Sequence, residues 1–143
     1  MTSYIYEWDR TFSLEHIRQE YPVYGTTDYR HPAIELLQEN GSRISEFQYD
    51  SYEIIDGKPK LPGLPATYTE SEGEAQTLRI FLKDALTGAK LALLYTIFDE
   101  YSAIARSAYI ENAGEKNLHV LNMMSLSLDL PDKDYEWMQL SGA

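Results

Sequence analysis

The chain has 143 residues, 43% hydrophobic and 24% charged, so it is the size of one domain and buries roughly two-thirds of its surface without metals or disulfides. It contains no cysteine, which excludes disulfides, thiolate metal sites and cysteine nucleophiles. The formal net charge of −11 makes nucleic acid and anionic membrane surfaces poor partners, because such a field repels phosphate groups.

Residues 1–23 are expected to form an extension that precedes the domain. One short helix within it is a hypothesis, since Ser13 can cap a turn, Leu14 and Ile17 follow at helical spacing, and Pro22 ends it. The amino terminus has neither the basic nor the apolar region of a secretory signal, and no apolar run approaches the roughly 18 residues of a membrane span. Together with the lack of disulfides, this predicts a cytoplasmic protein.

From Gly25 onward, short strand-like runs alternate with turns. The apolar run at 33–38 ends at Asn40-Gly41, the dipeptide most typical of a hairpin turn. The strand-like stretch 44–55 loses its alternation near Asp50, which predicts a bend or bulge. Residues 56–65 hold three of the six prolines and are expected to form a loop.

The second half of the chain carries the clearest strand pattern. Leu78, Ile80 and Leu82 occupy every second position, the period of a half-buried strand. Evenly spaced strands with short turns describe an antiparallel meander, so the predicted fold class is an all-β, antiparallel β-sandwich. The expected strands are a hairpin of 76–83 with 90–97, followed by 103–110, 118–130 and 135–140.

Five segments resemble the N-terminal domain of family 36 α-galactosidases in order and spacing. They are residues 24–33 (YGTTDYRHPA), 40–47 (NGSRISEF), 58–68 (KPKLPGLPATY), and the most specific pair, 126–132 (LSLDLPD) with 139–143 (QLSGA). The resemblance implies that residues 24–143 form the first part of a β-supersandwich of the galactose-mutarotase type. It further implies that the catalytic barrel of this family is absent from the chain.

The resemblance also implies an activity for the parent enzyme, which would remove terminal α-linked galactose from melibiose- and raffinose-type oligosaccharides with retention. Retention needs two carboxylates roughly 5–5.5 Å apart, and in this family both lie on the barrel. The chain alone is therefore expected to have no catalytic residue, no cofactor and no activity. Its expected partners are the oligosaccharide bound by the full-length enzyme, its own barrel, and neighbouring subunits of a homo-oligomer.

The substrate-binding candidates are Asp28, Tyr29 and Arg30. Asp28 can accept hydrogen bonds from sugar hydroxyls, Arg30 can donate several, and Tyr29 offers a stacking face. In family tetramers an N-terminal-domain loop reaches toward a neighbouring active site, and residues 26–32 resemble such a loop. The alternative is that Asp28 and Arg30 pair with each other or cap a turn.

No metal site is predicted. His16, His31 and His119 lie far apart and lack ligand spacing. Four carboxylates that cluster near the C-terminus lack the glycine and the distal glutamate of a calcium loop, and are better explained as a solvated turn. They are Asp129, Asp132, Asp134 and Glu136.

A second functional class stays open from the residues alone, a free-standing carbohydrate-binding or interaction β-sandwich. The rings of Trp8 and Trp137 are possible sugar platforms, although the strand-like context of Trp137 favours packing. A reading frame that continues into a barrel would decide for the glycosidase.

Overall fold

The structure is a computed structural model that describes residues 17–25, 28–63, 66–131, 133–136 and 138–139. Its strands pair antiparallel within two sheets, and one isolated bridge, between Val23 and Ile34, is parallel. The predicted all-β, antiparallel fold class is confirmed. The strands are β1 (Ile34–Gln38), β2 (Phe47–Asp56), β3 (Ala75–Asp84), β4 (Ala89–Phe98), β5 (Ala103–Asn112) and β6 (Leu118–Met123).

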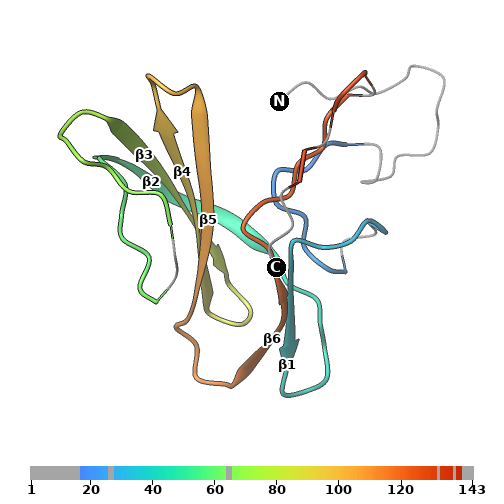
Figure 1. Cartoon of the computed structure of the whole chain (residues 1–143). Coiled ribbons are helices and arrows are strands. Elements are labelled where there is room, and N and C mark those ends of the chain that lie inside the picture. Colours follow the sequence, from blue (N-terminus) through green and yellow to red (C-terminus); the bar gives the residue numbers. More distant parts are fainter. Residues whose placement is uncertain (1–16, 26–27, 64–65, 132, 137, 140–143) are drawn as a thin grey trace.

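Strands β2 to β5 form a four-stranded meander in which each strand pairs with its neighbour in sequence (Figure 1). The predicted hairpin is confirmed as β3 and β4, whose register places Lys83 opposite Lys90. The turn between them is closed by the Gly88 amide, which donates to the Asp84 carbonyl at 2.9 Å, and Gly88 takes a φ of 76°. Glycine adopts this left-handed conformation without the steric cost of a side chain.

The bend predicted near Asp50 is also confirmed. The register of β2 against β3 shifts between Tyr49 and Ser51, so Asp50 has no partner residue in the ladder. An extra residue of this kind is a β-bulge, which bends a strand and increases its twist.

The hairpin predicted at Asn40-Gly41 is wrong. A turn does form there, because the Gln38 amide donates to the Ser42 carbonyl at 2.9 Å, but β1 does not pair with the strand that follows. Instead β1 pairs with β6, and β2 joins the other sheet. The reason is packing: β1 carries buried Ile34, which lies in one cluster with Leu91 of β4, so β1 belongs to the facing layer.

Of the two predicted C-terminal strands, 118–130 was predicted too long, and the prediction of a strand at 135–140 is wrong for the residues of that range that the structure describes. β6 ends at Met123, and the described residues of 124–139 form no strand. The Met124 amide still donates to the Ala33 carbonyl at 2.8 Å, but β1 starts at Ile34, so no partner strand continues beyond that point. A strand without a neighbour leaves its backbone groups to water, and the chain becomes irregular.

The N-terminal helix proposed from the sequence lies almost entirely outside the described residues. Residues 17–20, which are described, are not helical. Within the described part of the chain, no helix is long and apolar enough to cross a membrane.

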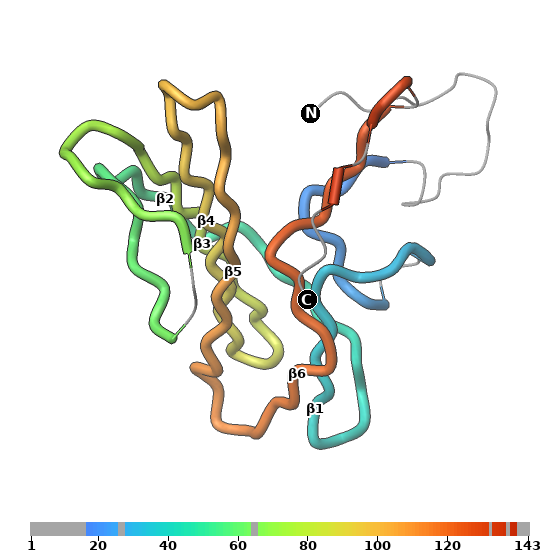
Figure 2. Tube along the Cα trace, viewed as in Figure 1, coloured from blue at the N-terminus to red at the C-terminus, as the bar shows by residue number. Residues whose placement is uncertain are grey.

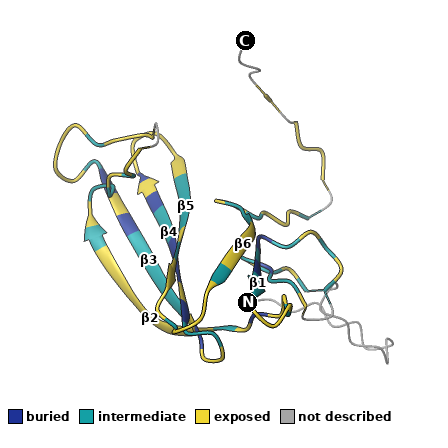
Figure 3. Cartoon of the chain, turned by 90° about the horizontal axis from the view of Figure 1, so that it is seen from below, coloured by how far each residue is buried: buried dark blue, intermediate teal, exposed yellow. Residues whose placement is uncertain are grey.

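The core lies where the two sheets face each other (Figures 1 and 2). Ile34 and Leu36 of β1 pack against Leu91 and Leu93 of β4, and all four side chains are buried. Full burial of a leucine or isoleucine side chain stabilises a fold by about 1.5–3 kcal/mol. Figure 3 shows that burial concentrates on β1 and the central strands, whereas β2 is largely exposed.

Candidate functional site

The three candidate substrate-binding residues lie beside a segment from the other end of the chain. Tyr29 and Arg30 face residues 128–130 across an open hollow, whose remaining lining comes from Ile17 and Arg18. Asp28 does not line the hollow but is bonded to Arg30. The hollow is therefore built by segments about a hundred positions apart in sequence.

Asp28 is held inside this arrangement. Its side chain is 1% exposed, and its two oxygens accept from Gln19 Nε2 at 2.8 Å and from Arg30 Nε at 2.7–2.9 Å. The Arg30 amide donates to Asp28 Oδ1 as well, at 3.1 Å. The pairing of Asp28 with Arg30, weighed above as the alternative to sugar binding, is thus observed.

Arg30 ties three segments together. Besides its bond to Asp28, its Nη1 forms an ion pair with Asp129, and its Nη2 donates to the Ile17 carbonyl at 2.7 Å. An arginine fork suits this task, because its donors are fixed in one plane. The C-terminal segment is thereby fastened to the loop.

Tyr29 is the one candidate whose side chain is turned to solvent, with 86% of its area exposed. A tyrosine ring of this kind is available to stack on the apolar face of a sugar. Binding of substrate by Asp28, Tyr29 and Arg30 stays a prediction. In the structure Asp28 and Arg30 support the loop, whereas Tyr29 projects from it.

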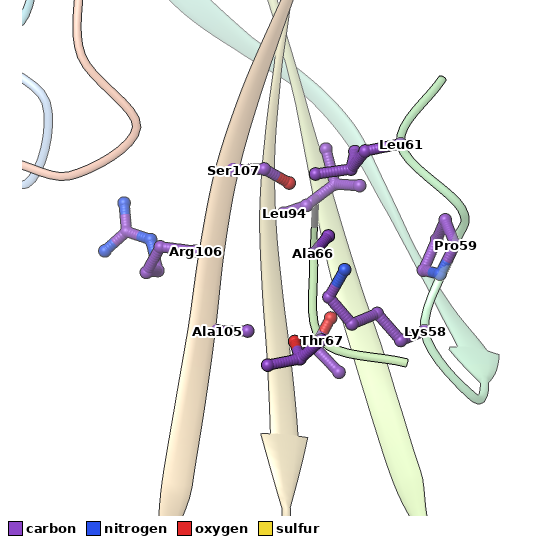
Figure 4. A pocket seen from close by; sticks show the side chains of 10 residues that line it. Lys58, Pro59, Leu61, Ala66, Thr67, Leu94, Ala105, Arg106 and Ser107 are labelled. Atoms are coloured by element: carbon purple, nitrogen blue, oxygen red, sulfur yellow. The ribbon is translucent and has the colours of Figure 1, made fainter. Parts of the chain in front are cut away.

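A small cavity of about 190 Å³ lies on the face of the meander that points away from the core, beneath the loop that follows β2 (Figure 4). Thr77 donates to the Gly57 carbonyl at 2.7 Å, and its oxygen lies 2.8 Å from the Thr96 hydroxyl oxygen. Because a hydroxyl carries one proton, Thr96 must donate to Thr77. This fixed order of donors ties the loop to β3 and β4.

A charged cluster on the core side of the meander, with a buried arginine and an exposed glutamate, was missed from the sequence. The Arg106 side chain, 10% exposed, stacks over the Tyr95 ring at 3.9 Å, and its Nη1 lies 2.5 Å from Glu20 Oε1. Tyr95 donates to the same oxygen at 2.8 Å. The sequence did contain a sign of this cluster. Arg106 alternates with apolar Ile104 and Ala108, and alternate residues of a strand point to the same side of the sheet.

Two tyrosines close to Arg106 have a raised pKa. Burial raises the pKa of Tyr21 to about 12, against a smaller lowering effect of Arg106. Burial, followed by the hydrogen bond to Glu20, raises the pKa of Tyr95 to about 12 as well. Both phenols therefore keep their protons at any physiological pH and act as donors.

No metal centre is formed by the described residues, in which no three His, Cys, Asp or Glu side chains come together. His31 and His119 are both exposed. His16, Asp132, Trp8 and Trp137 lie outside the described residues, so the expectations attached to them stay predictions.

Comparison with known proteins gives a consistent result. Residues 2–143 match the glycosyl hydrolase family 36 N-terminal domain. The chain is 50% identical to the α-galactosidase AgaA of Geobacillus stearothermophilus over 135 residues, which are 94% of this chain and 18% of that protein. It is 39% identical to the α-galactosidase Mel36A of Lactobacillus acidophilus over 94% of this chain and 18% of that protein.

Solved structures agree with the sequence match. AgaA in complex with stachyose superposes with a TM-score of 0.82 at 50% identity, covering 86% of this chain and 17% of that one. The α-galactosidase from Lactobacillus brevis superposes with a TM-score of 0.81 at 40% identity, over 85% of this chain and 16% of that one. The chain thus spans less than a fifth of the length of these relatives. It belongs to the family of N-terminal domains of glycosyl hydrolase family 36.

Proposed function

We propose that this chain is the N-terminal domain of an α-galactosidase that releases α-linked galactose from raffinose- and stachyose-type oligosaccharides. The observation that carries the proposal is the match of residues 2–143 to the family 36 N-terminal domain. It is supported by 50% identity to AgaA, for which structures with stachyose and with raffinose exist. Such sugars are neutral, so the net charge of −11 does not oppose their binding.

The proposal assigns the catalytic carboxylates to another part of the parent enzyme. Retaining hydrolysis needs one carboxylate as nucleophile and one as acid/base, roughly 5–5.5 Å apart. Four carboxylates of this chain are bonded within the fold. Asp28 and Asp129 bind Arg30, Glu20 binds Arg106, and Asp84 caps the β3–β4 turn. The isolated chain is accordingly inactive.

Within the parent enzyme, the loop of Asp28, Tyr29 and Arg30 approaches the substrate. Tyr29 supplies the contact, because it is exposed at the hollow. Asp28 and Arg30 hold the backbone of the loop, because their side chains are bonded to each other. The parent enzyme is a cytoplasmic homo-oligomer in this proposal, and neither nucleic acid nor membrane is its partner.

The test is hydrolysis by the intact polypeptide and by residues 1–143 alone, with p-nitrophenyl α-galactoside, raffinose and stachyose as substrates and p-nitrophenyl β-galactoside as control. We expect the intact polypeptide to release galactose from the α-linked substrates only, and the isolated chain to release none. An intact polypeptide that binds raffinose without cleaving it would instead indicate a carbohydrate-binding sandwich. Turnover by the isolated chain would refute the assignment of the carboxylates.

A further inference from the structure

Residues 58–68, one of the segments by which the chain resembles family 36, have no part in the proposed function. They run over the cavity of about 190 Å³ on the outer side of the meander, the side that points away from the core (Figure 4). Residues of this loop line the cavity on one side, and residues of β4 and β5 line it on the other. The loop is thus placed to hold a small ligand against the sheet.

The start of the loop is fixed to the sheet beside the cavity. The Gly57 amide donates to the Ala75 carbonyl at 2.8 Å, and the Gly57 carbonyl accepts from Thr77 at 2.7 Å. Lys58 follows, and Pro59 restricts it to extended conformations, because the proline ring would clash with a helical neighbour. The backbone that carries the Lys58 side chain is therefore in place before a ligand arrives, which lowers the entropic cost of binding.

Lys58 differs from the other lysines of the chain. All of them are exposed, whereas Lys58 is half-buried, and its side chain reaches into the cavity (Figure 4). Among the described residues, the Lys58 ammonium has no ion-pair or hydrogen-bond partner. Moving an ammonium group out of water without an acceptor costs free energy, and fixing its flexible stem costs conformational entropy. An acceptor bound in the cavity would offset both costs.

Two hydroxyl groups join the Lys58 ammonium in the lining. Thr67 supplies one from the loop, and Ser107 supplies the other from β5, where it lies opposite Leu94. Neither hydroxyl has a hydrogen-bond partner among the described residues. The described residues of the lining include no carboxylate, in a chain with 23 acidic residues, and the Arg106 guanidinium points away from the cavity (Figure 4). The cavity therefore offers donors and one positive charge, a combination that favours an anion.

We propose that this cavity binds a small inorganic oxyanion of the phosphate or sulfate class. The Lys58 ammonium supplies the counter-charge, and the hydroxyls of Thr67 and Ser107 donate to the oxygens of the anion. Charge-assisted hydrogen bonds of this kind are roughly twice as strong as neutral ones. The size agrees, because a cavity of about 150 Å³ holds benzene, so about 190 Å³ admits a phosphate ion but neither a hexose phosphate nor an oligosaccharide.

The net charge of −11 does not prevent this binding. Exposed carboxylates act on an anion from a distance, and at physiological ionic strength charges more than about 8 Å apart are largely screened. Lys58 lines the cavity itself, so its attraction acts at contact distance. Within the cavity, the local positive charge thus outweighs the field of the whole chain.

Equilibrium dialysis of the intact polypeptide with radiolabelled inorganic phosphate tests the proposal, with the ionic strength held constant by NaCl. Lys58→Met removes the charge and keeps a long, unbranched side chain. Lys60→Met is the matched control, because Lys60 lies on the same loop and carries the same charge but is exposed and does not line the cavity. Ser107→Ala removes one hydroxyl and leaves the charge in place.

We expect saturable binding of phosphate that sulfate displaces and raffinose does not. Lys58→Met should weaken this binding roughly tenfold or more, the scale of a hydrogen bond to a charged group. Lys60→Met should leave the affinity within about twofold of that of the natural chain, because it changes only a distant, screened charge. Ser107→Ala should weaken binding by about threefold to tenfold, the scale of a single hydrogen bond.

The proposal is wrong if the natural chain shows no saturable binding at millimolar phosphate. It is also wrong if Lys58→Met weakens binding no more than Lys60→Met does, since binding would then not depend on the cavity. Displacement of phosphate by raffinose would assign the site to a neutral sugar instead. Should Lys58→Met lack the native circular dichroism spectrum, Ser107→Ala decides, and an unchanged affinity in that variant overturns the proposal. None of these readouts depends on galactosidase activity, so the proposed function can fail independently.

Discussion

Asp28 shows how a residue chosen for its chemistry can serve the fold. Its carboxylate is buried, and both of its oxygens accept hydrogen bonds from Gln19 and Arg30. We expect Asp28→Ala to lower the free energy of unfolding by about 1–3 kcal/mol, because the donors of Gln19 and Arg30 would lose the carboxylate that accepts their hydrogen bonds. Chemical denaturation of the two proteins measures this. A loss below about 0.5 kcal/mol would show that the network contributes little.

Tyr29 should behave in the opposite way. Because 86% of the residue is exposed, Tyr29→Ala should change the free energy of unfolding by less than about 0.5 kcal/mol. If its ring stacks on substrate in the parent enzyme, kcat/KM for raffinose should fall by roughly threefold to tenfold, which corresponds to about 0.6–1.4 kcal/mol. Tyr68→Ala is the control, since Tyr68 is also largely exposed but lies on another loop. Equal kinetics for both variants would remove Tyr29 from the substrate site.

The buried tyrosines make stability depend on pH in the alkaline range. Burial, the largest cause, raises the pKa of Tyr21 and of Tyr95 from 10.0 to about 12. Between these values the folded chain holds protons that the unfolded chain has lost, so the free energy of unfolding falls as pH rises. Below pH 10 this contribution is fully present.

Urea unfolding between pH 9 and 12 measures this fall, and a variant with both Tyr21→Phe and Tyr95→Phe is the comparison. We expect a steeper decline for the natural chain than for the variant, whatever their stabilities at pH 9. Parallel curves would mean that the two phenols ionise alike in the folded and unfolded states.

At the scale of the elements, the loop between β5 and β6 touches the β3–β4 turn so closely that no side chain fits. A Cβ added to Gly114 would lie 2.0 Å from the Thr87 carbonyl oxygen. We expect Gly114→Ala to cost about 3 kcal/mol, because one of the two connections must move. Gly73→Ala is the control: Gly73 has a φ of 77° but nothing within 4 Å, so it should cost only about 1 kcal/mol of backbone strain. Thermal denaturation separates crowding from conformational strain, and equal losses would contradict the close approach.

The meander could be predicted from the sequence because its signals are local. Alternation at Leu78, Ile80 and Leu82 and the glycine turn at Gly88 specify β3 and β4 without reference to the rest of the chain. The bulge near Asp50 was visible for the same reason, as a break in the alternation. Pairing of β1 with β6 was not visible, because it depends on contacts between residues about 80 positions apart.

The candidate site was predicted only in part, for a related reason. The residue types at 28–30 indicated hydrogen bonding and stacking, but nothing local showed that Arg30 would meet Asp129. The Arg106 cluster had one local signal, a charge in an apolar series, while its partner Glu20 comes from a segment with no strand pattern. Long-range electrostatic partners are set by the fold, and a single sequence does not display them.

For the whole molecule, the net charge of −11 should make salt stabilising. Repulsion among excess carboxylates opposes the compact state, and added salt screens it. We expect the Tm at pH 7 to rise by roughly 2–4 °C between 10 mM and 500 mM NaCl, about 1 kcal/mol for a domain of this size. The increase should vanish near the isoelectric point of about 4.6, where the net charge is close to zero. A Tm that falls with salt at pH 7 would mean that ion pairs outweigh the repulsion.

The pairing of β1 with β6 determines how long β1 stays without its partner strand while the chain is synthesised. Each strand of the meander meets its partner as soon as the next hairpin arm is synthesised, whereas Gln38 of β1 waits for Leu118 of β6, 80 positions later (118 − 38). At about 5–20 residues per second, a ribosome needs roughly 4–16 s to cover that distance. During this interval Ile34 and Leu36 belong to a strand without a partner, so the nascent chain carries an apolar segment that a chaperone can hold until β6 emerges.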